Sequence, residues 1–128
     1  MAFTFLTKDE VLRFHAKGIE ELGGSHGLRD EGALESALLA AENRAYYEEA
    51  SLAVCAATYA YHLTQAHAFI DGNKRIGAVI AELFLWFNDA QLDMTNAEII
   101  ELFLKIAASE LTRDEVEQFF EQRIVMAQ

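Results

Sequence analysis

The stretch ASLAVCAATYAYHLTQAHAFI, residues 50–70, contains no Asp, Glu, Lys or Arg over 21 residues. A run of this length could span a bilayer. Polar side chains are spread along it, however, and such groups are costly in lipid unless they are paired. They are Ser51, Thr58, His62, Thr64, Gln65 and His67. We therefore interpret residues 49–66 as a helix that is apolar nearly all round and buried at the centre of a soluble core.

Five further helices are predicted around this central one. Capping boxes mark three of the starts, because a Thr and a Glu three residues later satisfy exposed backbone N–H groups; they begin at Thr7, Thr95 and Thr112. Asp30 is a plausible cap for another helix. The expected helices run over about 8–22, 31–44, 73–87, 96–109 and 113–125.

No period-2 run of β-branched residues is long enough to indicate a strand. The chain has no proline, so long helices are permitted through most of it. The sequence therefore predicts an all-α fold, a compact bundle of about six helices, as a single domain over residues 1–128.

Apolar spacing predicts which faces of the helices point inward. Val11, Phe14, Gly18 and Leu22 are expected on the inner face of the first helix. The 73–87 helix carries an apolar stripe at helical spacing, made of Ile76, Val79, Ile80, Leu83, Phe84 and Phe87. We expect this stripe, Trp86 and Cys55 to be packing residues of the core.

Charge and cysteine content exclude several classes of protein. Ten Lys and Arg against 21 Asp and Glu give a net charge of −11. Nucleic-acid binding and polybasic membrane contact both favour positive charge, so we expect neither partner. The single cysteine excludes an intrachain disulfide and a multi-cysteine zinc site. The N-terminal residues lack the pattern of a signal peptide, and we expect a cytoplasmic protein.

The segment HAFIDGNKR, residues 67–75, does not fit a purely structural role. It places a base, a carboxylate, an amide and two cations between the two most apolar helices. Gly72 permits a sharp turn, after which Asn73, Lys74 and Arg75 open the next helix. A helix N-terminus attracts anions and disfavours cations. Two cations at this end are therefore best explained by a bound polyanion, and phosphate is the natural one.

The neighbouring polar residues suggest a reaction at that phosphate. Asp71 is suited to hold Mg²⁺, which binds one or two carboxylates together with phosphate oxygens. His67 would supply a base beside the metal–phosphate group, the arrangement used to transfer a phosphorus group to a hydroxyl. His15, His26 and His62 have no such context, and we interpret them as structural.

These residues resemble the signature of the Fic/Doc family, His-x-Phe-x-(Asp/Asn/Glu)-(Gly/Ala)-Asn-(Gly/Lys)-Arg. The match comprises His67, Phe69, Asp71, Gly72, Asn73, Lys74 and Arg75. Residues 23–24, 45–49 and 57–59 also resemble the family, so that the resemblance extends over about 8–110 and implies the helical Fido fold.

The resemblance also implies a role for each matched residue. His67 would be the general base, and Asp71 would hold Mg²⁺. The phosphates of ATP, or of another nucleoside triphosphate, would be bound by Gly72, Asn73, Lys74 and Arg75. Phe69 would point into the core and fix the loop.

Two positions favour the Doc (death-on-curing) branch. Adenylyltransferases of the family have a small Gly in place of Lys74 and a second Arg in place of Ala78. The Doc branch binds the nucleotide in the opposite direction and phosphorylates a threonine of elongation factor Tu. Gly72 departs from this pattern, since Doc itself has Ala there. The resemblance implies a kinase that inhibits translation as the toxin of a type II toxin–antitoxin system.

The resemblance further implies control by a second protein. Many Fic proteins restrain themselves with a (Ser/Thr)-x-x-x-Glu-(Gly/Asn) motif. Here Gly27 and Leu38 stand four residues before Glu31-Gly32 and Glu42-Asn43, so the motif is missing. A small antitoxin acting in trans is expected instead. Two alternatives remain open, a Fic-type adenylyltransferase and a nucleotide-binding module without turnover.

Overall fold

The computed structural model describes residues 2–127, which form six helices and two short strands. The elements are α1 (Lys8–Leu22), α2 (Glu31–Glu48), α3 (Leu52–Gln65), α4 (Asn73–Phe87), β1 (Ala90–Leu92), α5 (Asn96–Ala107), α6 (Arg113–Arg123) and β2 (Ile124–Met126). The predicted all-α class is confirmed. The helices expected at 8–22 and 73–87 have the predicted bounds, whereas α2 continues beyond the predicted residue 44 to Glu48.

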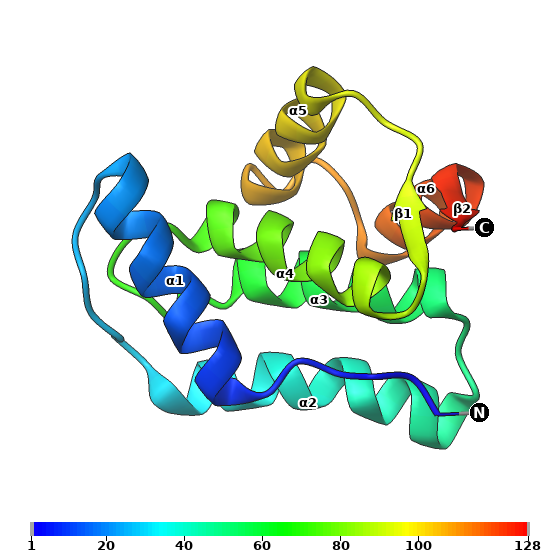
Figure 1. Ribbon diagram of the computed structural model, residues 1–128, viewed down its shortest axis with the longest axis horizontal. Helices are drawn as coiled ribbons and strands as arrows, with labels where there is room; N and C mark the ends of the chain where they lie inside the picture. Colours follow the sequence, from blue (N-terminus) through cyan, green and yellow to red (C-terminus); the bar gives the residue numbers. More distant parts are fainter. Residues whose placement is uncertain (1, 128) are drawn as a thin grey trace.

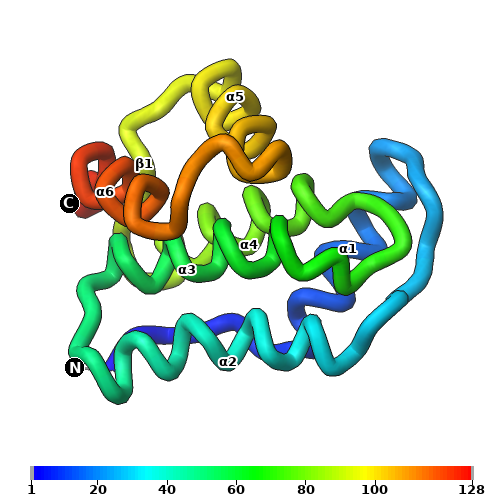
Figure 2. Tube along the Cα trace, turned by 180° about the vertical axis from the view of Figure 1, so that it is seen from behind, coloured from blue at the N-terminus to red at the C-terminus, as the bar shows by residue number. Residues whose placement is uncertain are grey.

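Helix α3 is the centre of the bundle (Figure 1). It packs most extensively against α4, and then against α2 and α6. Figure 2 shows the same layering from behind, with α2 on one side of the α3–α4 pair and α5 on the other. The prediction of a buried central helix is confirmed by the α3 residues that are buried, namely Ala53, Cys55, Ala56, Ala57, Thr58, Tyr59, Ala60, Leu63 and Thr64.

Capping residues in the local sequence determine where the helices begin. All three predicted capping boxes form, at Thr7, Thr95 and Thr112, each with both reciprocal hydrogen bonds. Asp30 caps α2 as predicted, and Ser51 caps α3. These side chains satisfy backbone N–H groups that have no partner inside their own helix.

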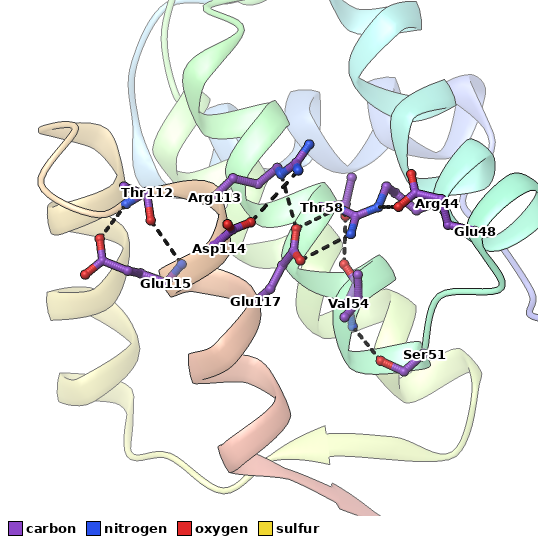
Figure 3. Close-up of polar contacts among 10 residues, drawn as sticks. All are labelled: Arg44, Glu48, Ser51, Val54, Thr58, Thr112, Arg113, Asp114, Glu115 and Glu117. Atoms are coloured by element: carbon purple, nitrogen blue, oxygen red, sulfur yellow. Dashed lines mark hydrogen bonds and ion pairs between the residues drawn. The ribbon is translucent and has the colours of Figure 1, made fainter.

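A half-buried ion pair fastens α6 to the bundle (Figure 3). Arg44 of α2 donates from Nη1 and Nη2 to the Glu117 carboxylate of α6, at 2.6 and 3.2 Å. Arg44 also bonds Glu48, and Arg113 approaches Glu117 from the other side. Only 15% and 12% of the Arg44 and Glu117 side chains are exposed. If Arg44 or Glu117 were lost, the remaining charge would keep only its weaker and more exposed partner, Arg113 or Glu48, so the contact between α2 and α6 would be weakened.

Two predicted inward-facing residues point outward instead. Leu22 is 70% exposed, because α1 buries Val11, His15 and Ile19, a row spaced four residues apart. Trp86 is 71% exposed, because the face of α4 that packs into the core carries Ile80, Ala81, Phe84 and Leu85 instead. Both expectations were wrong for one reason: apolar spacing defines a stripe, and neighbouring helices decide which edge of it they cover.

A small antiparallel sheet was also missed. β1 pairs with β2 in the register Ala90↔Met126, Gln91↔Val125 and Leu92↔Ile124. The last helix therefore ends at Arg123 rather than at the predicted residue 125. Strands of three residues are too short to display a sequence alternation, and their pairing joins segments far apart in the chain.

Two further features concern the central stretch. No helix in the described part of the chain, residues 2–127, is both long and apolar enough to cross a membrane.

Cys55 is completely buried in α3, and this burial raises the pKa of its thiol from 9.0 to about 11. The thiol is therefore protonated at neutral pH and behaves as a packing group, as predicted.

The packing of α4 against α3 leaves no room for a side chain at Gly77. A Cβ built there would overlap the Thr64 hydroxyl and lie 3.3 Å from the Ala60 carbonyl oxygen. The Thr64 Oγ1 atom is buried and has no hydrogen-bond partner among residues 2–127. The small glycine thus lets the two helices come together directly beneath the loop that joins them.

We expect Gly77→Ala to destabilise the protein by about 1–3 kcal/mol through overpacking, despite the better helix propensity of Ala. Adding Thr64→Ala should recover most of the loss, since it removes the overlapping hydroxyl. Gly32→Ala in α2 is the matched control, because a Cβ there meets only Asp30 Oδ1, at 3.5 Å. Urea unfolding of the four proteins measures the effect. Equal stability of the Gly77 and Gly32 variants would contradict this packing argument.

Candidate functional site

The predicted site lies on the loop between α3 and α4, at the end of the bundle crossed by α1 (Figures 1 and 2). Helix α3 ends at Gln65, and the Ala66 N–H donates to the His62 carbonyl. His67 follows with φ of 50°, an unusual conformation for a residue other than glycine. Gly72 closes the loop with φ of 79°. The His67 side chain is exposed, and Phe69 is only 2% exposed.

Asn73 holds the loop closed. Its Oδ1 accepts from the Phe69 N–H at 3.0 Å, and its Nδ2 donates to the Phe69 carbonyl at 2.9 Å. No side chain caps the start of α4, where Gly72 is the N-cap residue. The amide therefore shapes the loop, and the first turn of α4 keeps the character of an anion site. The phosphate contact predicted for Asn73 stays a prediction.

A second segment of chain, residues 23–30, runs alongside the loop. Leu28 and Phe69 form an isolated antiparallel bridge, and the Ile70 N–H donates to the Gly27 carbonyl. The N–H groups of Arg29 and Asp30 both donate to the Ala68 carbonyl, at 2.7 and 2.9 Å. The site loop is thus paired along its length with the turn that joins α1 to α2.

Asp71 is bound through its carboxylate to both segments. Its Oδ2 accepts from the Ser25 N–H at 3.1 Å, and its Oδ1 accepts from the Gly72 N–H at 2.8 Å. These two bonds, with a smaller contribution from Arg75, hold the pKa of Asp71 below its usual 3.8. A Cβ at Gly24 would lie 2.7 Å from Oδ2. Glycine at 24 thus makes room for the carboxylate.

Arg75 contacts the end of α1. Its Nη1 donates to the carbonyls of Gly18 and Gly23, at 3.3 and 3.1 Å. A cation is favoured there, because the C-terminal end of a helix carries partial negative charge. Five N–H donors belong to a guanidinium, so these two bonds leave others for an anion. Lys74, one residue earlier, is exposed.

Two hollows open on either side of Arg75. One, of about 220 Å³, lies between α1 and α4 and is lined by Phe14, Lys17, Leu22 and Val79 among others. The other, of about 400 Å³, lies between α4 and α5. It is lined by Lys74, Arg75, Ala78, Val79, Glu82, Asn96, Ile99, Ile100 and Phe103. A ligand bound at the start of α4 has room to extend along either side of that helix.

Comparison with known proteins identifies the family. A family model described as the Fic/DOC family matches residues 5–85. The chain belongs to the Fic/DOC family. A curated relative, protein kinase doc of Escherichia phage P1, is 31% identical over 108 residues, which cover 84% of this chain and 85% of that protein. The expected resemblance is therefore confirmed.

The site of this Fic/DOC chain contains one carboxylate, Asp71, that is available as a metal ligand. No group of three or more His, Cys, Asp or Glu residues within 2–127 is placed to hold a metal ion. Asp71 is a single exposed carboxylate at the start of α4. Mg²⁺ commonly binds one or two carboxylates and takes its other ligands from phosphate and water. Asp71 is therefore the residue that would hold such an ion, and the binding of Mg²⁺ and of a nucleotide stays a prediction.

The sequence predicted the motif loop but not the residues of other segments that contact it. Asp71 is contacted by His15 and by the Ser25 N–H. Arg75 is contacted by the carbonyls of Gly18 and Gly23. Three of these contacts use backbone atoms, which leave no trace in side-chain identity. Two signals were present in the sequence: the Gly23-Gly24 pair, which resembles the family, and His15, a polar residue spaced four from both Val11 and Ile19 on a buried face.

We expect the Ser25 and Gly72 amide resonances to report the ionisation of Asp71. A lowered carboxyl pKa means that the two hydrogen bonds are present above pH 3.8 and are lost as the pH falls through the lower folded value. An NMR pH titration should give both amides a shared midpoint below 3.8. Asp71→Asn is the control and should abolish the step. A midpoint at or above 3.8 would show that the carboxylate does not accept these bonds.

Proposed function

We propose that this protein is a Doc-like toxin that transfers the terminal phosphate of ATP, or of another nucleoside triphosphate, to a hydroxyl of a target protein. One observation carries the proposal. Lys74 and Arg75 lie in the first turn of α4, which begins at Asn73 and has no side-chain cap, and Asp71 and the exposed His67 lie on the loop that leads into this turn. The proposal joins an anion site, a metal ligand and a base within nine residues.

Each residue of the motif has a defined task in this proposal. The N–H groups of the first turn of α4, with Lys74 and Arg75, bind the phosphates. Asp71 holds the Mg²⁺, which neutralises charge on the phosphate oxygens. His67 accepts the proton of the target hydroxyl as its oxygen bonds to the terminal phosphorus. The bond from that phosphorus to the bridging oxygen breaks, and the nucleoside diphosphate leaves.

Phosphoryl transfer is favoured over adenylyl transfer by two side chains. Lys74 adds bulk and charge where adenylyltransferases of the family have glycine. Ala78, which lines the α4–α5 hollow, stands where those enzymes have a second arginine. The curated relative bears the name protein kinase, which supports the same choice. A threonine of elongation factor Tu is the target that we propose from the Doc resemblance.

The proposal includes a small antitoxin that binds in trans. An unstructured segment that folds on binding can cover a large surface and is removed easily by proteolysis, which would release the toxin. The net charge of −11 favours a partner segment rich in Lys and Arg, because opposite charge speeds encounter at low salt.

The reaction type is tested by incubating the protein with γ-labelled or α-labelled ATP, Mg²⁺ and purified elongation factor Tu or a bacterial lysate. We expect label on protein from γ-ATP alone. His67→Ala should reduce transfer by about 10²–10⁴-fold, the usual contribution of a general base, without loss of fold. His26→Ala, which removes an exposed histidine outside the motif, is the matched control. Transfer from α-ATP would establish an adenylyltransferase, and full activity of His67→Ala would exclude His67 as the base.

Control in trans is tested in growing cells. We expect expression of this chain alone to slow growth, and co-expression of the small gene beside it to restore growth. His67→Ala should be harmless, while Lys105→Ala, on the exposed face of α5, should stay toxic. Harmless expression of the folded protein in its native host without a partner would exclude the toxin and favour the nucleotide-binding module.

A further inference from the structure

His15 is a buried histidine of α1 whose contacts lie on the site loop. It is 6% exposed. Its Nε2 lies 2.7 Å from the carbonyl oxygen of Asp71. Its ring stacks on Phe69, with centroids 3.7 Å apart and an angle of 12° between the planes. The contacts of this side chain thus reach from the ring of Phe69 to the backbone carbonyl of Asp71.

Gly72 also lies next to the imidazole ring of His15. A Cβ built on Gly72 would lie 3.4 Å from Nε2 and 3.7 Å from Cδ2 of His15. The loop backbone therefore turns against the imidazole ring where it enters α4. Because a carbonyl oxygen only accepts hydrogen bonds, Nε2 must carry a proton and act as the donor.

A histidine that only fills the core would contribute its ring to packing and would need no hydrogen bond to the loop. Filling the core requires only the ring, which a Phe of similar shape could supply. The Nε2–H bond instead fixes the peptide between Asp71 and Gly72, whose orientation determines where the Asp71 carboxylate lies and how α4 begins. We propose that His15 is a positioning residue that sets this peptide for Mg²⁺-nucleotide binding; the nucleotide part rests on the proposed function.

The expected loss on removing the donor is moderate. Groups that orient a metal ligand from behind commonly contribute 10–100-fold to affinity or activity. We therefore expect Mg²⁺-ATP to bind about 10–100-fold more weakly to His15→Phe. His15→Gln, whose side-chain amide also presents an N–H near the Nε2 position, should recover most of the affinity. His15→Phe keeps an aromatic ring against Phe69, so the two variants separate the hydrogen bond from the stacking.

Amide hydrogen exchange gives a readout that does not depend on nucleotide. The Ser25 and Gly72 N–H groups donate to the Asp71 carboxylate and report its position. They should exchange about tenfold faster in His15→Phe, the effect expected from losing one hydrogen bond. Val11→Ala is the matched control: it weakens the same buried face of α1 at a residue without a hydrogen bond to the loop.

The outcomes are distinct. Faster exchange in His15→Phe than in Val11→Ala, with recovery in His15→Gln, supports the positioning role even if the protein transfers no phosphate. Equal exchange rates in His15→Phe and Val11→Ala overturn the positioning role. Failure of His15→Gln to restore the slow exchange also overturns it. Should His15→Phe not fold, ¹⁵N NMR of the wild-type imidazole decides: a protonated Nε2 supports the hydrogen bond, and an unprotonated Nε2 excludes it.

Discussion

Helix α3 has no charged residue along its length and is buried on nearly every side, so the rest of the chain must cover it. Helices α2, α4 and α6 pack directly against it, and their own outer faces then determine where the remaining elements can lie. Gly77 lets α4 approach closely, and the Arg44–Glu117 pair fastens α6. Most of the architecture follows from burying this one helix.

The polar motif lies on the loop that follows α3, beyond the part of that helix covered by α2, α4 and α6. Burying the loop would leave its backbone groups without partners, and exposing it fully would leave it mobile. The chain resolves this by pairing the loop with residues 23–30 and with the end of α1. The side chains of His67, Asp71 and Lys74 are exposed, while the backbone of the loop is held by hydrogen bonds to residues 27–30 and to His15.

Positive charge is concentrated locally in a strongly acidic chain. Arg75 belongs to the first turn of α4 and donates to the Gly18 and Gly23 carbonyls at the end of α1, where a helix carries partial negative charge. This contact fixes the position of the arginine before any ligand binds. Fixing a side chain before a ligand binds reduces the conformational entropy that binding costs, and this advantage would apply to the phosphate predicted at this helix start.

The sequence by itself determined the helices, the central position of α3 and the family, because caps, helical spacing and a contiguous nine-residue motif are local properties. It also placed His67, Asp71, Lys74 and Arg75 on one loop at the start of α4. Tertiary structure alone decided that Trp86 and Leu22 face outward and that β1 pairs with β2. It also placed His15 and the backbone of residues 18–27 around Asp71 and Arg75. Those arrangements join segments more than thirty residues apart through backbone groups and shared surfaces, which residue identity does not encode locally.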